Sequence, residues 1–241
     1  MRKTSKTKRI LKILMGIVIF ITLPSFLFFG YIYIKYDEEL PTGEVSIKAD
    51  KLAEKMLDAL DYQAYKNTDY LEWTFKGRNC YKWYKADDSC EVKWKDFKVM
   101  LNFQKPNLSK VFVLNQEYNG IEKQKYINKA TSYFNNDSFW LVAPYKVFDK
   151  GVERKLVKTK EQKDALLVTY TSGGTTPGDS YLWHFDDNGK PTSYKMWVDI
   201  LPIRGLEASW NDWKTTKSGA QLPTFHKLLF LGLELTDIKT L

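Results

Sequence analysis

Serine, histidine and aspartate recur at even spacing in one stretch of the sequence, as Ser180, His184 and Asp186. On a single strand they would share one face, and these residue types serve hydrolases as nucleophile, base and orienting acid. At about 3.3 Å per residue, however, Ser180 and His184 lie roughly 13 Å apart along the strand, whereas a nucleophile and its base need about 3 Å. His184 and Asp186 stay within side-chain reach, but a half-exposed strand explains them more simply. We therefore expect a protein that is not an enzyme, with a hydrolase around His184 and Asp186 as the disfavoured alternative.

Soft metal ligands are scarce, since the 241 residues include two Cys and two His. These are too few for a zinc finger, an iron–sulfur site or a three-histidine catalytic metal, so we expect no metal and no other cofactor. His184 and His226 would form a metal site only if folding brought them together with carboxylates. Cys80 and Cys90 flank a predicted turn, and outside the cytoplasm they would form either a disulfide or two free thiols.

The net charge of +8 is concentrated at the N-terminus. Six of the 37 Lys and Arg residues lie before residue 13, which leaves 31 basic residues against 29 acidic ones in the rest of the chain. A nucleic-acid-binding domain would show a strong basic excess on its folded part. The sequence therefore indicates no nucleic-acid partner.

Residues 13–34 form a run of 22 residues without a charge. As a helix this run spans roughly 33 Å, enough to cross a bilayer. Basic residues precede it and three tyrosines, Tyr31, Tyr33 and Tyr36, cluster at its far end, so the N-terminus is expected in the cytoplasm. A cleaved secretory signal would have a shorter apolar core and a small-residue cleavage site, and a buried core helix seldom follows a basic N-terminus directly. We predict a cytoplasmic basic segment (residues 1–12), a transmembrane signal anchor (13–34), a polar linker (35–45) and an extracytoplasmic domain (46–241).

Periodicity divides the domain into helices and strands. Apolar residues at spacings of three and four predict a helix from Ser46 or Asp50 to Leu60, and a second helix over residues 120–136. Alternation with a period of two predicts about eleven strands, near residues 70–75, 81–84, 90–94, 97–103, 111–114, 154–158, 165–171, 180–185, 193–200, 206–213 and 224–234. Short connections between strands favour an antiparallel sheet over parallel βαβ units.

Several strands carry apolar residues on both faces. In residues 193–200 the set Tyr194, Met196, Val198 and Ile200 shares one face, while Trp197 lies on the other. Two packed layers would explain this pattern, and so would a strongly curved sheet whose concave side is partly covered by helices and partly free to hold an apolar ligand. Both interpretations remain open at the level of pattern.

Two segments of the C-terminal half resemble a known family. DSYLWHFDDNGKPTSYKMWVD (residues 179–199) looks like a family hairpin with a D-x-x-G-x-P turn, and LEASWNDW (206–213) with SGAQLP (218–223) is similar to the strand, tryptophan and G-x-x-x-P loop that follow it. The family is that of the bacterial lipoprotein carriers, with a LolA-like fold, and the resemblance covers roughly residues 46–241. FWLVAPYKVFDKG (139–151) and GGTTPGD (173–179) look like parts of a related, membrane-anchored branch of envelope proteins. The resemblance implies an incomplete antiparallel barrel of about eleven strands, with two or three helices on the concave side, preceded here by one transmembrane helix.

We therefore expect a single-pass protein of a bacterial inner membrane, with the C-terminal domain in the periplasm. In the hollow of the half-barrel it would bind a lipid, an acyl chain or another apolar ligand without covalent chemistry. The alternative is a structural or adaptor module that docks an envelope protein partner and holds no ligand. The expected wall and lid residues are Leu52, Met56, Trp73, Phe75, Leu101, Phe103, Trp183, Met196 and Trp210.

Overall fold

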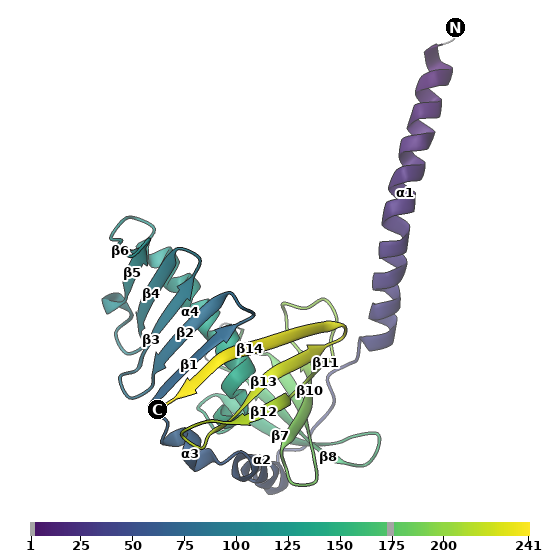
Figure 1. The fold of residues 1–241 in the computed structure, drawn as a ribbon. Coiled ribbons are helices and arrows are strands. Elements are labelled where there is room, and N and C mark those ends of the chain that lie inside the picture. Colours follow the sequence, from purple (N-terminus) through teal and green to yellow (C-terminus); the bar gives the residue numbers. More distant parts are fainter. Residues whose placement is uncertain (1–2, 173–175) are drawn as a thin grey trace.

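The computed structural model describes residues 3–172 and 176–241, so residues 173–175 of the GGTTPGD segment lie outside the described part of the chain. Its strands form one antiparallel 14-stranded sheet in the order β6-β5-β4-β3-β2-β1-β14-β13-β11-β10-β9-β8-β7, with β12 paired to β13 (Figure 1). The first half of the sheet contains β1 (Tyr70–Phe75), β2 (Asn79–Tyr84), β3 (Ser89–Trp94), β4 (Phe97–Asn102), β5 (Lys110–Val113) and β6 (Gln116–Glu117). The second half contains β7 (Val152–Lys158), β8 (Asp164–Tyr170), β9 (Ser180–Phe185), β10 (Pro191–Trp197), β11 (Leu206–Ser209), β12 (Asn211–Thr215), β13 (Gln221–Leu228) and β14 (Leu231–Thr240). Pairing of β1 with β14 joins the two halves.

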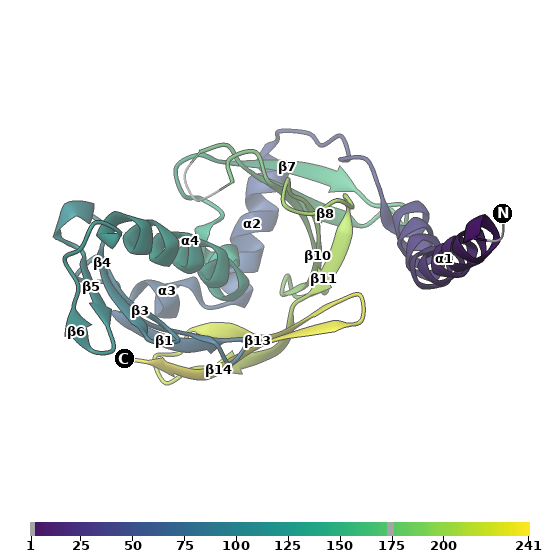
Figure 2. The same cartoon turned by 90° about the horizontal axis from the view of Figure 1, so that it is seen from above.

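The sheet bends strongly and stays open, with β6 and β7 as its free edges (Figure 2). Helix α4 (Lys123–Val142) connects these two edge strands along the chain and crosses the concave side on its way. A short 3₁₀ turn, Ala143–Lys146, continues it. The buried residues Ile127, Ala130, Phe134 and Leu141 follow helical spacing and face the sheet. The interpretation as a curved sheet with helices in its hollow thus agrees with the arrangement, whereas two flat layers do not.

Helix α2 (Ile47–Ala59) and the short α3 (Tyr62–Lys66) also lie on the concave side. Ser46 is the N-cap of α2, because its hydroxyl accepts a hydrogen bond from the Ala49 amide at 3.4 Å. Asp50 pairs instead with Arg154 of β7 at 2.6 Å and thereby fastens α2 to the edge of the sheet.

The described residues form fourteen strands, three more than predicted, and four α-helices, of which α3 is the one that the periodicity did not predict. The predicted strand 206–213 is two strands, broken at Trp210, and the predicted strand 224–234 is the hairpin β13–β14. The turn at Leu229 and Phe230 contains no Gly, Pro or Asn that would mark it, whereas Asn211 and Asp212 directly after Trp210 are turn-forming residues that the period of two obscured. The two-residue β6 is too short for a periodic signal. The predicted helix 120–136 begins later and runs on to Val142.

Helix α1 (Lys3–Tyr36) projects away from the domain (Figure 1). Its stretch from Lys6 to Tyr36 is long and apolar enough to cross a membrane, and the most apolar part is not buried inside the protein. A core helix of a soluble domain would be mostly buried, so that alternative does not apply to α1. Only its last turns touch the domain, where Ile32 is buried.

Residues 37–44, which we call the strap, are fastened to the sheet although their sequence reads as a polar linker. Asp37 accepts hydrogen bonds from the Arg204 backbone at 2.9 Å and from its guanidinium at 3.2 Å. Glu38 pairs with Lys195 at 2.7 Å, and its carbonyl accepts the indole N–H of Trp197 at 2.9 Å. At the far end Glu44 forms an antiparallel bridge with Leu156 of β7. The strap therefore protects the β7 edge and holds α1 in a fixed place against the domain.

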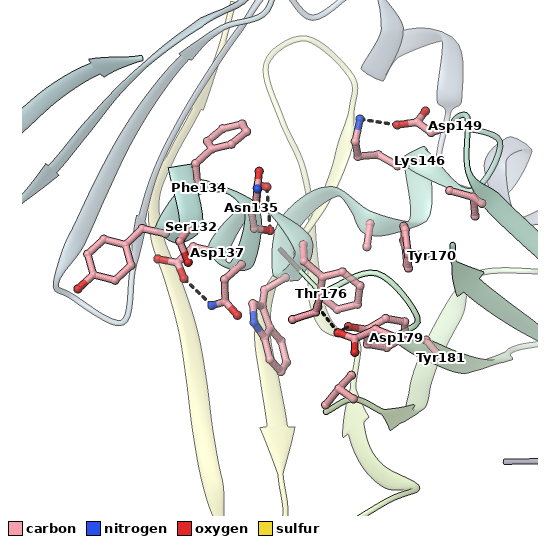
Figure 3. A pocket seen from close by; sticks show the side chains of 18 of the residues that line it. Ser132, Phe134, Asn135, Asp137, Lys146, Asp149, Tyr170, Thr176, Asp179 and Tyr181 are labelled. Atoms are coloured by element: carbon pink, nitrogen blue, oxygen red, sulfur yellow. Dashed lines mark hydrogen bonds and ion pairs between the residues drawn. The ribbon is translucent and has the colours of Figure 1, made fainter. Parts of the chain in front are cut away.

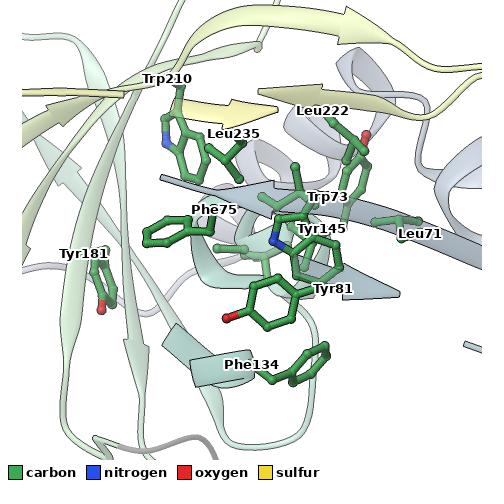
Figure 4. Packing of buried hydrophobic residues seen from close by; sticks show 14 of the residues in the cluster. Leu71, Trp73, Phe75, Tyr81, Phe134, Tyr145, Tyr181, Trp210, Leu222 and Leu235 are labelled. Atoms are coloured by element: carbon green, nitrogen blue, oxygen red, sulfur yellow. The ribbon is translucent and has the colours of Figure 1, made fainter. Parts of the chain in front are cut away.

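The strap and the concave core explain why both faces of strands 165–171 and 193–200 are apolar. The main core on the concave side includes Val168, Trp183 and Met196, together with the aromatic rings shown in Figure 4. A second, small cluster on the opposite face consists of Val157, Ala165, Leu167, Leu182 and Trp197. The strap covers this cluster at Trp197 and Val157, where Gly43 lies so close that an added Cβ would be 3.0 Å from Val157.

Candidate functional site

A cavity of about 850 Å³ lies between helix α4 and the two halves of the sheet (Figure 3). Its floor is α4 from Ser132 to Trp140, and further walls come from β2, the ends of β8 and β10, and the loop that follows β10. Cavities that bind small ligands measure roughly 300–1,000 Å³, so this one is large enough for a lipid chain. The domain's own side chains therefore fill the hollow only in part and leave this space beside α4.

Aromatic and aliphatic side chains line the middle of the cavity. Trp83, Phe103 and Phe134 form one side, where the rings of Phe103 and Phe134 are 4.8 Å apart. Phe139 and Tyr181, 4.5 Å apart, form the other side. Because ring faces give large contact areas without a fixed hydrogen-bond pattern, this lining suits an apolar chain more than a polar metabolite.

Asp137 is a carboxylate on the largely apolar inner face of α4. It is 2% exposed and accepts hydrogen bonds from the Tyr81 hydroxyl at 2.5 Å, the Asn79 amide at 2.9 Å and the Asn136 amide at 2.8 Å. Burial raises the pKa of Asp137, while these three donors oppose the rise. With its oxygens occupied, Asp137 clamps α4 to β2 and sets the position of the cavity floor.

A second polar group lies on the β9 side of the cavity. Asp179 is buried and accepts a hydrogen bond from the Thr176 hydroxyl and a longer one, 3.4 Å, from the Tyr181 hydroxyl. The nearby Tyr170 hydroxyl also lines the cavity and has no hydrogen-bond partner among the described residues. Burial raises the pKa values of Tyr170 and Tyr181, so both stay neutral donors.

Three lysines are among the cavity-lining residues, together with the carboxylates of Asp88 and Asp149. The lysines are Lys85, Lys146 and Lys150. Lys146 is paired with Asp149 at 2.7 Å, whereas Lys85 has no carboxylate partner among the described residues. Its ammonium donates to the Tyr65 carbonyl at 2.6 Å and lies 4.0 Å from the centre of the Tyr65 ring. Burial, with Lys146 nearby, lowers the pKa of Lys85 to about 8, as expected for a cation short of compensating negative charge.

Of the nine predicted wall and lid residues, Phe103 and Met196 line the cavity. The other seven lie in or against the core beneath it: Leu52, Met56, Trp73, Phe75, Leu101, Trp183 and Trp210. The alternation with a period of two predicts correctly that the strand residues face the concave side. Helices α2 and α4 and neighbouring aromatic rings cover them on that side, so they do not line the cavity. Trp73, for example, stacks on Tyr81 at 4.5 Å, and Trp210 lies 5.0 Å from Tyr194.

The part of the lining that comes from α4 was not predicted from the sequence. Phe139 and Trp140 fell beyond the predicted end of this helix, and Asp137 and Ser138 were not recognised. A usable signal existed, because polar residues at buried positions of an amphipathic helix often face a cavity or a partner group.

The two cysteines are free thiols, and their positions rule out the disulfide alternative. Cys80 pairs with Lys93, and Cys90 pairs with Trp83, so the two are offset along the β2–β3 hairpin. Cys80 is exposed on the convex face, whereas Cys90 is buried on the concave face. Side chains that leave a strand pair on opposite faces cannot meet the geometry of a disulfide.

The residues first considered for catalysis have other partners. The Ser180 hydroxyl bonds to that of Thr169 at 2.8 Å. The Asp186 carboxylate accepts the backbone N–H groups of Asn188 and Lys190, both at 2.9 Å, and so shapes the β9–β10 turn. His184 pairs in register with Ser193. Within the described ranges, no three His, Cys, Asp or Glu side chains form a group able to hold a metal ion.

His226 belongs to the core of the second half of the sheet. It is fully buried, its Nδ1 lies 2.8 Å from the Ser209 carbonyl, and its ring is 4.8 Å from that of Trp210 and 5.2 Å from that of Trp140. Burial lowers the pKa of His226 to about 4, so the ring is neutral at neutral pH and Nδ1 donates to Ser209. His226 therefore stabilises the packing of α4 on β13 and does not face the cavity.

Comparison with known proteins gives weak matches of fold alone. No protein-family model matches the chain, and no curated protein matches it. Among solved structures it is similar to a DUF1329 family protein from Desulfovibrio piger, with 7% identity and a TM-score of 0.40 over 80% of this chain and 92% of that one. It is also similar to a domain from Vibrio parahaemolyticus described as an outer membrane lipoprotein-sorting protein domain, with 8% identity and a TM-score of 0.34 over 78% of this chain and 93% of that one. Matches at this level assign neither a family nor a function to the chain.

Proposed function

We propose that the protein is a single-pass bacterial envelope protein whose domain binds a lipid or another molecule with an acyl chain, without a covalent step. The observation that supports this most directly is the aromatic-lined cavity of about 850 Å³ beside α4. The apolar helix α1, which would hold the domain at the surface of an inner membrane, supports a ligand drawn from that membrane.

Burial of the chain would supply the binding free energy. About twelve methylenes at roughly 0.8 kcal/mol each contribute about 10 kcal/mol, from which several kcal/mol are lost to ordering and association. A remainder of about 6 kcal/mol corresponds to a dissociation constant of some tens of micromolar. No reacting group is needed for such a role.

Lys85 favours an anionic head group on this ligand. Lys85 lines the cavity in a half-buried position and forms no ion pair with a carboxylate of the described residues, so a negative charge on the ligand would add to the partial compensation that Asp69 gives. A carboxylate or phosphate of the ligand would lie beside Lys85, and the acyl chain would follow α4 toward Phe139 and Met196.

The binding role is tested by photo-crosslinking of the full-length chain in phospholipid vesicles. A palmitate analogue with a diazirine on its chain should label peptides that contain Phe139 or Met196, as mass spectrometry would read out. Lipid that merely surrounds a membrane helix would label α1 instead. Label confined to α1 would contradict the proposal, and would favour a module that docks an envelope partner without a ligand.

The anionic head group is tested by replacing Lys85 with glutamine. Loss of one charge-assisted hydrogen bond should weaken palmitate binding by roughly tenfold, about 1.4 kcal/mol, and leave hexadecanol binding unchanged. Lys93→Gln is the matched control, since Lys93 is an exposed lysine on the neighbouring strand β3. If Lys85→Gln weakened both ligands equally, Lys85 would act on the fold and not on the head group.

A further inference from the structure

The turn between β13 and β14 presents apolar residues to the outside. Phe230 is 70% exposed and Leu231 is 56% exposed. Two-residue hairpin turns usually contain Gly, Asn or Asp, because these residues tolerate positive φ. Here Leu229 takes a φ of +54°, a left-handed conformation that is unfavourable for a bulky side chain. Large apolar side chains therefore occupy this turn although their exposure to water is unfavourable and although the backbone conformation at Leu229 disfavours them.

This hairpin tip lies beside helix α1, as Figures 1 and 2 both show. The ring of Phe230 is 6.3 Å from that of Phe28. Phe28 belongs to the charge-free run of α1 and lies on the membrane side of the tyrosines at residues 31, 33 and 36. The strap anchors this contact, because Asp37 at its start pairs with Arg204 of the loop after β10 and so fixes the end of α1 to the domain.

The contact between Phe28 and Phe230 indicates how deep the hairpin tip would lie in a bilayer that α1 spans. Phe28 lies six residues before Ile34, the end of the charge-free run, which corresponds to roughly 9 Å along the helix. Apolar faces of interfacial segments lie about 5–10 Å below the head groups. A tip at the level of Phe28 therefore reaches the outer part of the hydrocarbon.

The same region meets the aliphatic end of the cavity. Leu228, the last residue of β13, lines the cavity, and so do Ile200 and Leu201 of the loop after β10. Ile200 is also 68% exposed. The loop continues to Arg204, which binds Asp37 at the end of α1. The apolar side chains of the β13–β14 hairpin and of this loop thus lie both on the outer surface and in the lining of the cavity.

We propose that the β13–β14 tip inserts into the leaflet that faces the domain, next to α1, and that the ligand enters the cavity from this leaflet past Ile200 and Leu228. The insertion depends on α1 spanning the bilayer, and the entry route rests on the proposed lipid-binding function. The occupant of the exposed apolar surface is the bilayer itself, because α1 and the tip are in contact within one chain.

Insertion is tested with a fluorophore at the tip of the full-length protein in phosphatidylcholine vesicles. Phe230→Cys is labelled with bimane in a Cys80→Ser background, since Cys80 is exposed and Cys90 is buried. Lipids brominated near the top of the acyl chain should reduce its fluorescence roughly by half. Leu241→Cys is the matched control, because Leu241 is a 70% exposed leucine at the C-terminus, which Figure 1 shows on the side of the domain away from helix α1, and it should respond to iodide in the water instead. A label at residue 230 that responds to iodide and not to brominated lipid would overturn the insertion.

Entry from the leaflet is tested by the rate at which pyrene-labelled palmitate moves from vesicles into the full-length protein. Replacing Phe230 and Leu231 together by serine should slow this transfer about tenfold and leave the equilibrium affinity unchanged, since neither residue lines the cavity. Binding with an unchanged transfer rate would overturn the entry route alone. Absence of palmitate binding in the unaltered chain would overturn the proposed function and the entry route together, whereas quenching at residue 230 would still support insertion.

Discussion

Acidification from pH 7 to pH 4 is expected to reduce the free energy of unfolding through His226 by about 3 kcal/mol. Burial holds the pKa of His226 near 4 in the folded protein, against an ordinary value of 6.5. Above pH 6.5 the ring is neutral in both states, so it adds no pH dependence. Between pH 6.5 and 4 the unfolded chain binds a proton that the folded protein does not, so stability falls as the pH falls. The effect is complete once the pH is below the folded pKa.

His226→Asn isolates this contribution, because an asparagine amide can still donate toward the Ser209 carbonyl but does not titrate. Urea unfolding of the full-length protein in detergent, followed by tryptophan fluorescence, reports on the domain, since α1 contains no tryptophan. Burial also lowers the pKa of His184, which changes stability in the same direction and is present in both proteins. The difference between the two pH profiles therefore belongs to His226. Parallel profiles would show that His226 is accessible to protons in the folded state.

Ser132→Trp should weaken palmitate binding by about 100-fold, because the indole would occupy part of the cavity. Ser132 lies on α4 and lines the cavity without being fully buried, so the larger side chain has free space to enter. Displacing about four methylenes of the ligand at roughly 0.8 kcal/mol each costs about 3 kcal/mol, the equivalent of this fold-change.

Thr131→Trp on the same helix is the control, since Thr131 precedes Ser132 but does not line the cavity. Both variants are compared by titration with palmitate and by their urea midpoints. Equal affinity in Ser132→Trp and the unaltered protein, with the fold intact, would place the ligand outside this cavity. Loss of affinity in both variants would point to a general disturbance of α4.

Much of the fold was predictable because period and turn chemistry agree along most of the domain. The α2 cap at Ser46 was predicted, as were most strands from β1 to β10, each bounded by turn residues or by polar segments. The prediction was wrong where apolar residues form the turn, at Leu229 and Phe230, because such a turn has the same pattern as a continuous strand. The strap was also misread, since only the fold brings Asp37 to Arg204 and Glu38 to Lys195.

The candidate site was harder to predict than the sheet. The alternation of apolar and polar residues along a strand indicates which side chains face the hollow. It does not indicate which of these side chains are covered by helices. Trp73 and Trp183 are fully buried under such cover, whereas Phe103, directly after β4, and Met196, near the end of β10, line the cavity. The charge in the cavity lining was also invisible, because Lys85 and Lys146 are 61 positions apart and meet only through the fold.

The strap couples the orientation of the domain to the physical state of the membrane. A flexible tether would let the domain rotate freely, but here Asp37 is hydrogen-bonded to Arg204 immediately after α1 ends. A membrane helix tilts when its apolar length exceeds the thickness of the hydrocarbon layer. Because no flexible linker separates α1 from the sheet, a tilt of α1 also tilts the whole domain. The depth of Phe230 in the bilayer would therefore depend on the thickness of the bilayer.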